Sequence, residues 1–251
     1  MKNMRVQIVS DLHIERSKQN ITLTDFITPT GDILVLAGDI GSMYRLRQLF
    51  NFLHQACEHF PLVIYVPGNH EYYKLYKSTP RSFSTLENAM RGFITTHKNM
   101  HFLNRKTLQI ENTLFVGATL WSNPTNFTNK IVQINGITRE RFITRHKLDK
   151  EFITKSLEHG KKNNLKTFVV THYPPVLDAK NPLKNDKYAG LYVNDLDYLL
   201  KDADVWVSGH THFNYQKTKN NCLLVTNQLG KPKDDIKDYS PTMVIQINGK
   251  I

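Results

Sequence analysis

The chain has 251 residues, of which 40% are hydrophobic and 22% are charged, a balance typical of a globular protein and not of a disordered one. It is long enough for one large domain with its own core, and no apolar run approaches the roughly 20 residues that cross a bilayer. The first residues lead directly into an apolar run and leave no room for a signal peptide, so we expect a cytoplasmic protein without a membrane partner.

The formal net charge is +11 at pH 7, and much of the excess lies in residues 139–166. Such a stretch is typical of the solvated face of a surface helix, which is the interpretation that we favour. The alternative is a basic rim that attracts phosphorylated substrates, so nucleic acid stays a possible partner. The two cysteines, Cys57 and Cys222, are far apart, and we expect small buried side chains instead of a disulfide.

Strand and helix patterns alternate through the first half of the chain, which favours a layered α/β fold. Apolar runs that indicate buried strands occupy residues 6–9, 33–37 and 62–66. After the second of these runs, apolar residues at helical spacing from Leu46 to Cys57 predict a helix, and the same spacing recurs over residues 80–97.

From residue 101 the pattern changes to short apolar runs with little room for helices between them, which predicts an antiparallel stretch. The runs span residues 101–103, 107–110 and 114–119, with a turn at Glu111-Asn112. Residues 121–136 are rich in Asn and Thr and indicate an irregular segment, and a long polar helix is predicted over residues 138–162. Together, residues 121–162 are a candidate specificity insertion.

Strand patterns return in the last third of the chain, at residues 167–170 and 204–207, with a predicted helix over residues 193–200 between them. Hairpin-like runs follow at residues 213–218, 223–226 and 243–247. The predicted fold class is α/β (α+β), with two mixed β-sheets packed as a sandwich and flanked by helices. We expect residues 1–251 to form a single domain, since no clean linker interrupts the chain.

Metal-binding and acid–base side chains gather in five short segments, each of which lies where a predicted strand ends. The segments are Asp11-Leu12-His13, Gly38-Asp39, Gly68-Asn69-His70-Glu71, Thr171-His172 and Gly209-His210-Thr211-His212. In an open α/β sheet, ligands collect outside the carboxyl ends of the strands, so the segments are expected to meet in one crevice. Their side chains would be sufficient to bind two metal ions.

The spacing within the segments indicates how the side chains are used. Asp11 and His13 are two residues apart, and in an extended segment such side chains point the same way, which also applies to His210 and His212. Nitrogen and oxygen ligands without a thiolate leave Mn, Fe, Zn and Ni as candidates. The remaining histidines follow no such pattern and are assigned no role; they are His54, His59, His97, His101, His146 and His159.

In their order and composition, the five segments resemble the calcineurin-like metallophosphoesterase family over residues 5 to about 215, with no part of the pattern missing. For a first metal ion, the resemblance implies the ligands Asp11, His13 and His212. For a second ion, it implies the ligands Asn69, His172 and His210. It further implies that Asp39 bridges both ions, that His70 is the catalytic histidine, and that the fold is a β-sandwich flanked by helices.

The chemistry of such a site is hydrolysis at phosphorus. Two ions about 3.5–4 Å apart clamp an in-line displacement, and a water that they share becomes a hydroxide nucleophile near neutral pH. His70 would protonate the departing alkoxide or stabilise the transition-state oxygens. Glu71 is a candidate either to orient His70 or to cap the next segment. Candidates for stacking on a base or an aryl group are Tyr72, Tyr73 and Tyr173.

The sequence therefore predicts a phosphohydrolase, either a phosphatase or a phosphodiesterase, that acts on a small or nucleotide-type substrate. A nuclease is the alternative within catalysis, and the basic composition supports it. A non-catalytic metal-binding scaffold is the alternative of another class, but it predicts a broken motif, and none is broken. Candidate substrate-side loops are residues 121–127, 178–188 and 226–230.

Overall fold

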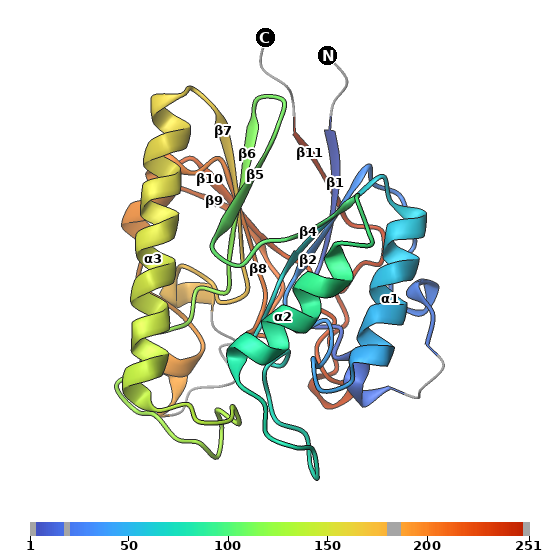
Figure 1. The fold of residues 1–251 in the computed structure, drawn as a ribbon. Coiled ribbons are helices and arrows are strands. Elements are labelled where there is room, and N and C mark those ends of the chain that lie inside the picture. The colour runs from blue at the N-terminus through green and yellow to red at the C-terminus, as the bar shows by residue number, and fades with distance from the viewer. Residues whose placement is uncertain (1–3, 18–20, 180–186, 248–251) are drawn as a thin grey trace.

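The computed structural model describes residues 4–17, 21–179 and 187–247, and within these residues two β-sheets pack face to face (Figure 1). The first sheet has the strand order β11-β1-β2-β3-β4, formed by Val244–Ile247, Met4–Val9, Ile33–Ala37, Leu62–Val66 and Met100–Phe102. The second has the order β5-β6-β7-β8-β10-β9, formed by Lys106–Ile110, Thr113–Ala118, Lys166–Thr171, Val205–Ser208, Cys222–Thr226 and Gln216–Lys219. The predicted sandwich of two sheets is confirmed.

Both sheets are mixed, with parallel strands in the centre and an antiparallel strand at every edge except that of β4. Strands β1 to β4 are parallel and β11 joins β1 antiparallel, while β6, β7, β8 and β10 are parallel between the antiparallel edge strands β5 and β9. The prediction of an antiparallel stretch after residue 101 is therefore correct only for the β5–β6 hairpin. Strand β4 pairs parallel with β3 in the other sheet, because short apolar runs do not specify their partners.

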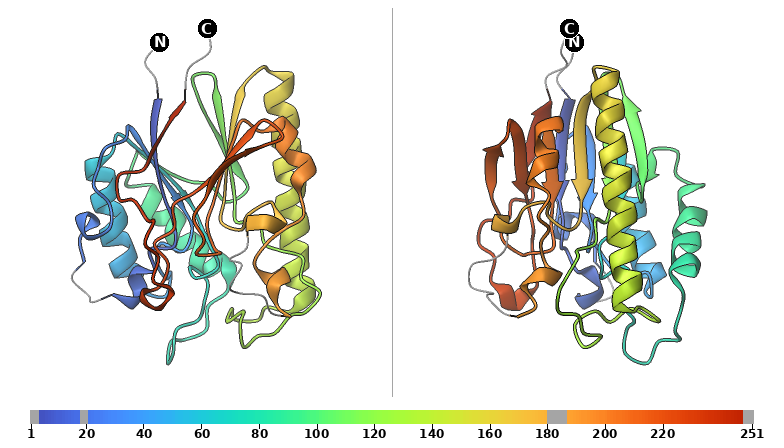
Figure 2. Two further views of the ribbon diagram at one scale, coloured as in Figure 1. Left: turned by 180° about the vertical axis from the view of Figure 1, so that it is seen from behind. Right: turned by 90° about the vertical axis from the view of Figure 1, so that its left-hand side faces the viewer.

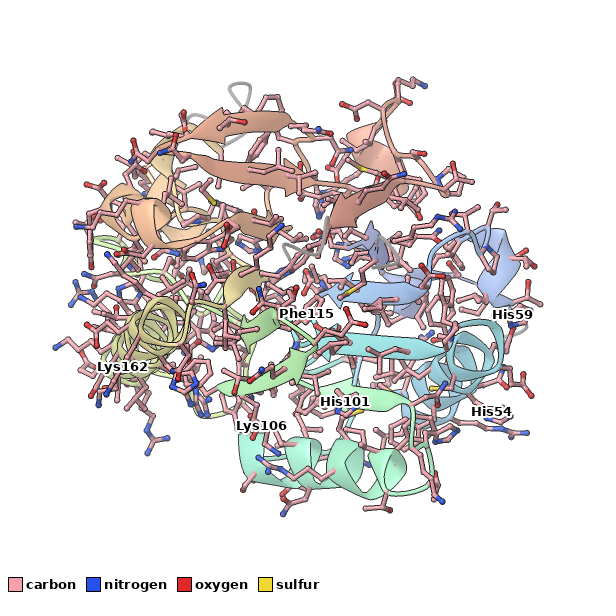
Figure 3. The ribbon with its side chains drawn as sticks, turned by 90° about the horizontal axis from the view of Figure 1, so that it is seen from above. His54, His59, His101, Lys106, Phe115 and Lys162 are labelled. Atoms are coloured by element: carbon pink, nitrogen blue, oxygen red, sulfur yellow. The ribbon has the colours of Figure 1, made fainter. Side chains whose placement is uncertain are left out.

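The helices cover the outer faces of the sandwich (Figures 1 and 2). Helices α1 (Leu46–His59) and α2 (Phe83–Ile94) lie on the first sheet, and α3 (Arg139–Lys162) lies on the second. Viewed from above, His54 and His59 of α1 and Lys162 of α3 lie at the periphery, whereas Phe115 of β6 lies in the layer between the sheets (Figure 3). These three predicted helices are thus present: α1 extends two residues beyond its expected end at Cys57, and α2 and α3 are shorter than their expected spans.

The core explains why the central strands are hydrophobic at consecutive positions. In β2, Ile33, Val35 and Ala37 point into the layer between the sheets, while Leu34 and Leu36 point outward beneath the helices. A strand that is covered on both faces has no polar side, so its sequence is a continuous apolar run. This packing fixes the parallel strands in register and brings their carboxyl ends to one end of the sandwich.

The last predicted helix and the predicted irregular segment are both present as short or irregular structure. The helix predicted over residues 193–200 is a short 3-10 helix, η5 (Asp197–Asp202), and the chain before it is held by Asn194, whose side-chain amide donates to the carbonyls of Leu120 and Pro174. The predicted irregular segment has no helix or strand over residues 121–138.

No described helix combines the length and the apolar character needed to span a membrane. Cys57 and Cys222 are free thiols; Cys222 is buried as predicted, whereas Cys57 is only half-buried.

Candidate metal centre

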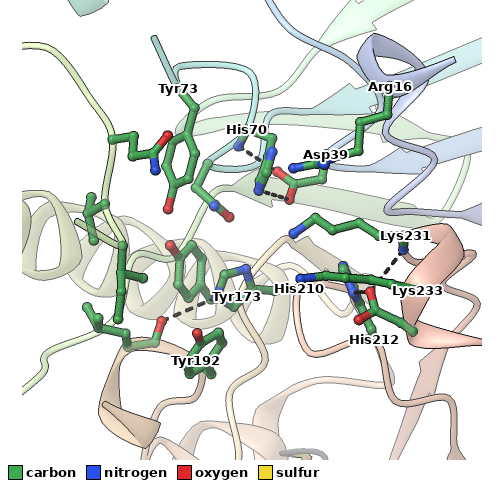
Figure 4. A pocket seen from close by; sticks show the side chains of 16 residues that line it. Arg16, Asp39, His70, Tyr73, Tyr173, Tyr192, His210, His212, Lys231 and Lys233 are labelled. Atoms are coloured by element: carbon green, nitrogen blue, oxygen red, sulfur yellow. Dashed lines mark hydrogen bonds and ion pairs between the residues drawn. The ribbon is translucent and has the colours of Figure 1, made fainter. Parts of the chain in front are cut away.

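The five donor segments lie together at one end of the sandwich, where β1, β2, β3, β7 and β8 have their carboxyl ends. The first sheet contributes the segments that contain Asp11, His13, Asp39, Asn69 and His70. The second sheet contributes the segments that contain His172, His210 and His212. Several of these side chains line a cavity of about 320 Å³, and the others are buried beneath it (Figure 4).

The first donor group consists of Asp11, His13 and His212. The Nε2 atoms of His13 and His212 are 3.2 Å apart, and Asp11 Oδ1 lies 3.2 Å from His212 Nε2. The other ring nitrogens face carboxylates, with His13 Nδ1 3.3 Å from Glu15 and His212 Nδ1 2.5 Å from Asp234. The two Nε2 atoms and the Asp11 carboxylate thus converge on one point in a buried setting. A cation at that point would be bound by nitrogen and oxygen donors.

The second donor group has the same arrangement and consists of Asp39, Asn69, His172 and His210. His172 Nε2 lies 3.0 Å from Asn69 Oδ1, 3.2 Å from His210 Nδ1 and 3.3 Å from Asp39 Oδ1. The far ring nitrogens donate to backbone carbonyls, His172 Nδ1 to Ala37 and His210 Nε2 to Leu191. Nitrogen and oxygen donors again converge, so this group could also hold a metal ion.

Asp39 lies between the two groups and offers one carboxylate oxygen to each. Its Oδ1 is near His172 in the second group, and its Oδ2 lies 3.9 Å from His13 Nε2 in the first group. Burial opposes the charge, but the imidazoles of His172 and His70 hold the pKa of the Asp39 carboxyl well below its usual value. An ionised carboxylate in this position can contact two cations at once.

The backbone at the donors corrects one prediction. Five donors lie in the left-handed region and not in extended segments, with φ of 55° at Asp11, 48° at His13, 53° at Asp39, 73° at His210 and 51° at His212. Asp and His tolerate this region better than most residues, and such conformations cluster at functional sites. The donor side chains are therefore brought together by sharp turns at the strand ends, and strand alternation does not align them.

Two glycines allow the backbone to approach the donors closely. A Cβ atom at Gly68 would lie 2.3 Å from Asp39 Oδ1, and one at Gly209 would lie 2.4 Å from Asp11 Oδ2. Both distances are far too short for a side chain, so any substitution would displace a donor carboxylate. This is the physical reason for the small residue beside the donors in these two segments.

Glu71 connects the loops that carry the donors. Its carboxylate accepts the backbone N–H groups of Asp39, Ile40 and Gly68 at 2.8–3.0 Å, and it accepts the Tyr65 hydroxyl at 2.7 Å. The side chain is fully buried. Glu71 therefore holds the loop after β2 against the loop after β3 and does not orient His70, which was one of its predicted roles.

Glu15 is the carboxylate that lies beside Nδ1 of His70. His70 lines the cavity with its ring stacked on Tyr73, and its Nδ1 lies 3.4 Å from the Glu15 carboxylate, which also contacts His13. Burial disfavours the Glu15 charge, but the contacts with His13 and His70 lower its pKa to about 2. The Glu15 carboxylate thus lies behind the His70 ring, and Nε2 on the other side faces Asp39, whose Oδ2 is 4.0 Å away.

The cavity has two sides of different composition (Figure 4). One side has the aromatic rings of Tyr73, Tyr173 and Tyr192, and the other has the cationic side chains of Arg16, Lys231 and Lys233. Tyr72, which was predicted to stack on substrate, is buried instead, and its hydroxyl donates to Glu87.

The candidate substrate-side loops contribute unequally to the cavity. Residues 121–127 do not line it, because Trp121 is buried in the core, and Ile131 to Gln133 of the same irregular segment line it instead. In the loop over residues 226–230, Gln228 accepts the His212 N–H and supports the donor segment. Much of the loop over residues 178–188 lies outside the described residues.

The basic stretch over residues 139–166 does not reach the described part of the cavity lining. Several of its side chains have partners elsewhere: Lys155 pairs with Glu151, Lys161 pairs with Asp202, and Arg145 lies over the Phe83 ring. The stretch therefore forms the outer face of α3 in the described structure, as favoured from the sequence. The histidines to which no role was assigned are also absent from the described cavity lining.

Several residues of the site were not predicted from the sequence, chiefly Glu15, Asp234, Tyr192 and Lys231. Only Glu15 had a usable signal, because it follows His13 by two residues in the same segment. Asp234 and Lys231 lie beyond the last donor segment, in and beside the short 3-10 helix η6 (Pro232–Asp234), where nothing in the spacing indicates a site. Tyr192 is distant in sequence from every donor.

Comparison with known proteins identifies the family. Residues 4–214 match the family model described as calcineurin-like phosphoesterase. The chain belongs to this family. A calcineurin-like phosphoesterase is expected to act on phosphorylated substrates with bound metal, which agrees with the donor groups.

This calcineurin-like phosphoesterase is similar to a viral protein in sequence and to solved structures in fold. It is 29% identical to the uncharacterized protein L509 of Acanthamoeba polyphaga mimivirus, over 98% of both chains. Its fold is similar to that of phosphopantetheinyl hydrolase from Mycobacterium tuberculosis, with a TM-score of 0.67, 17% identity, and 96% and 95% of the two chains covered. It is also similar to a dimetal phosphatase from Danio rerio, with a TM-score of 0.52, 12% identity, and 89% and 86% covered.

Proposed function

We propose that this calcineurin-like phosphoesterase is a binuclear metal-dependent phosphohydrolase that cleaves a phosphomonoester or phosphodiester of small or nucleotide-type molecules. The observation that carries the proposal is the convergence of nitrogen and oxygen donors in two adjacent groups that share Asp39. The dimetal phosphatase and the phosphopantetheinyl hydrolase of similar fold support the same chemistry. Residues 1–251 act as one domain in this proposal, because each donor group draws on both sheets.

The donor groups suit two divalent ions such as Mn, Fe, Zn or Ni. The first ion would be held by Asp11, His13 and His212, the second by Asn69, His172 and His210, and Asp39 would contact both. The fit is supported by the second nitrogen of each imidazole, which meets an oxygen acceptor as expected for metal-ligating histidines. When bound, the ions would supply an activated water and offset charge on the phosphoryl oxygens.

His70 is the proposed catalytic side chain. Its Nε2 lies at the cavity beside Asp39, and its Nδ1 faces the Glu15 carboxylate. His70 is thereby placed to donate a proton from Nε2 to the leaving oxygen as the P–O bond breaks. Glu15 therefore acts as a positioning residue for His70.

A small substrate is favoured over a polynucleotide. The cavity volume of about 320 Å³ lies at the lower end of the range for small-molecule sites. The longest basic stretch of the chain lies on α3 and not in the described cavity lining, so it provides no continuous track for a nucleic-acid backbone. The nuclease alternative therefore has less support than it had from the composition.

The proposal is tested by hydrolysis of paired chromogenic aryl mono- and diester phosphates. Metal-stripped protein should be inactive, and addition of Mn, Fe, Zn or Ni should restore turnover that Asp39→Asn abolishes. The ratio of the two rates assigns mono- or diester preference. If two ions bind and neither these esters nor natural nucleotides are hydrolysed with any metal, the protein is a metal-binding scaffold and the proposal is wrong.

A further inference from the structure

The cationic side of the cavity has a composition that the metal chemistry does not require. Lys231 and Lys233 flank the start of η6, and Arg16 ends the 3-10 helix η1 (Ile14–Arg16) that follows His13. Within the described part of the chain, no carboxylate lies within 4.0 Å of either lysine ammonium. Arg16 reaches only Glu15, at 3.9 Å, and that carboxylate already contacts two imidazoles.

Lys231 is the central member of this set. Burial lowers the pKa of its ammonium, Arg16 adds to the decrease, and the carboxylate of Asp39 acts in the opposite direction. Clustered cations without a partner repel one another, so their arrangement is favourable only when an anion lies among them. Metal ions bound to Asp39 and Asp11 would cancel the charge of the nearest carboxylates and leave the cations free to bind another anion.

The opposite side of the cavity is aromatic and uncharged. The ring of Tyr173 lies 3.9 Å from that of His210, and Tyr192 stacks on the same imidazole at 5.4 Å. Tyr73 lies beside them, stacked on His70 (Figure 4). The donor groups therefore lie between a flat aromatic surface and a set of cations.

We infer that the substrate carries two phosphoryl groups joined through an oxygen, that its organic part packs on Tyr73, Tyr173 and Tyr192, and that its second phosphoryl group binds Lys231, Lys233 and Arg16. The inference rests on the proposed function and extends it from phosphate esters to a phosphoanhydride, with an organic diphosphate as the substrate class. Hydrolysis adds one water and breaks one bridging P–O bond. The bond electrons leave with the departing phosphate, and the products are the organic monophosphate and inorganic phosphate. The lysines offset the charge on the departing group.

The test compares adenosine 5′-diphosphate with adenosine 5′-monophosphate, at a fixed free concentration of the metal that restores activity. Phosphate release gives kcat/KM for each nucleotide with the wild type, Lys231→Met and Lys233→Met. The matched control is Lys237→Met, because Lys237 is exposed, pairs with Asp235 and lies outside the cavity lining. Turnover of the aryl ester is measured in parallel as an independent record of the proposed activity.

The wild type should prefer the diphosphate, and Lys231→Met should lower the diphosphate-to-monophosphate ratio about tenfold or more, as expected for loss of a charge-assisted contact. Lys233→Met should lower it less, and Lys237→Met should leave it unchanged. An unchanged ratio in both cavity variants, with aryl ester turnover intact, would overturn the inference alone. Preference for a single-stranded oligonucleotide, lost in Lys231→Met, would assign the cations to a polynucleotide and also overturn it. Absence of turnover of every ester would overturn the proposed function and this inference together.

Discussion

The two donor groups are built alike but supported differently. In the first group, the far nitrogens of His13 and His212 face the carboxylates of Glu15 and Asp234. In the second group, those of His172 and His210 face backbone carbonyls. A carboxylate behind an imidazole makes it a stronger electron donor than a neutral carbonyl does. The first group also has Asp11 where the second has the neutral amide of Asn69.

This difference implies that the two ions are not equivalent. The first group carries more negative charge, so its ion should bind more tightly and be lost last on chelation. The second group, with a neutral amide and neutral acceptors, should release its ion first. Four mutations test whether the two groups bind and use their ions differently.

The largest effect is expected for Asp39→Asn, because Asp39 is the one donor common to both groups among the described residues. The neutral amide should weaken both ions and lower kcat/KM by at least about a thousandfold. Metal content by mass spectrometry and aryl ester turnover measure the two effects. Loss of only one ion would show that Asp39 does not bridge the groups.

His70→Ala should lower kcat by about 10²–10³-fold while both ions remain bound, since His70 is proposed to transfer a proton and not to ligate metal. The loss should be larger for substrates with poor leaving groups, which need the proton most. His59→Ala, an exposed histidine on α1, is the control. If His70→Ala also loses an ion, the division of labour between Asn69 and His70 is wrong.

Asp234→Asn should act on the first group alone. Removing the carboxylate behind His212 should weaken one of the two ions by about 10–100-fold and leave the other unchanged, as seen in a metal titration followed by calorimetry. Asp235→Asn is a matched control, because its carboxylate is exposed and pairs with Lys237. Equal weakening of both ions would show that the Asp234 carboxylate does not support the first group alone.

The smallest effect concerns Glu15 and pH in the metal-free protein. The folded-state pKa of Glu15 is about 2, below its ordinary value of 4.5, so its contribution to stability is present above pH 4.5 and is lost as pH falls toward 2. Glu15→Gln should therefore lower the free energy of unfolding at pH 7 by about 2 kcal/mol relative to the wild type. This difference between variant and wild type should become smaller as the pH falls. Urea unfolding at pH 7 and pH 3 measures it, with Glu58→Gln on exposed α1 as the control. A difference in the free energy of unfolding that is the same at both pH values would contradict the prediction.

The sequence was most informative where one local rule decides the outcome. Buried strands were recognised because residues such as Leu34 and Val35 face apolar layers on both sides, and the donors were found because they follow those strands directly. Strand partners could not be predicted, since pairing of β4 with β3 depends on the whole sandwich. The left-handed turns at Asp11 and His13 were missed because Asp and His also fit extended segments.

The supporting residues were harder to predict than the donors themselves. Asp234 lies about twenty residues beyond His212 and reaches it only after the chain has formed β9 and β10. Tyr192 reaches the cavity through a turn at η4 (Ala189–Leu191), which no motif indicates. These contacts arise from the path of the chain in space, and sequence spacing does not encode that path.

Each donor group takes side chains from both sheets of the sandwich, Asp11 and His13 with His212 in one group and Asn69 with His172 and His210 in the other. Bound ions would therefore act as cross-links between two layers that pack on each other through an apolar core. Each ion present at a hundred times its dissociation constant would add about 2.7 kcal/mol to the free energy of unfolding. Chelation should then lower the melting temperature as well as abolish turnover, so the metal supply of the cell would control the lifetime of the protein together with its activity.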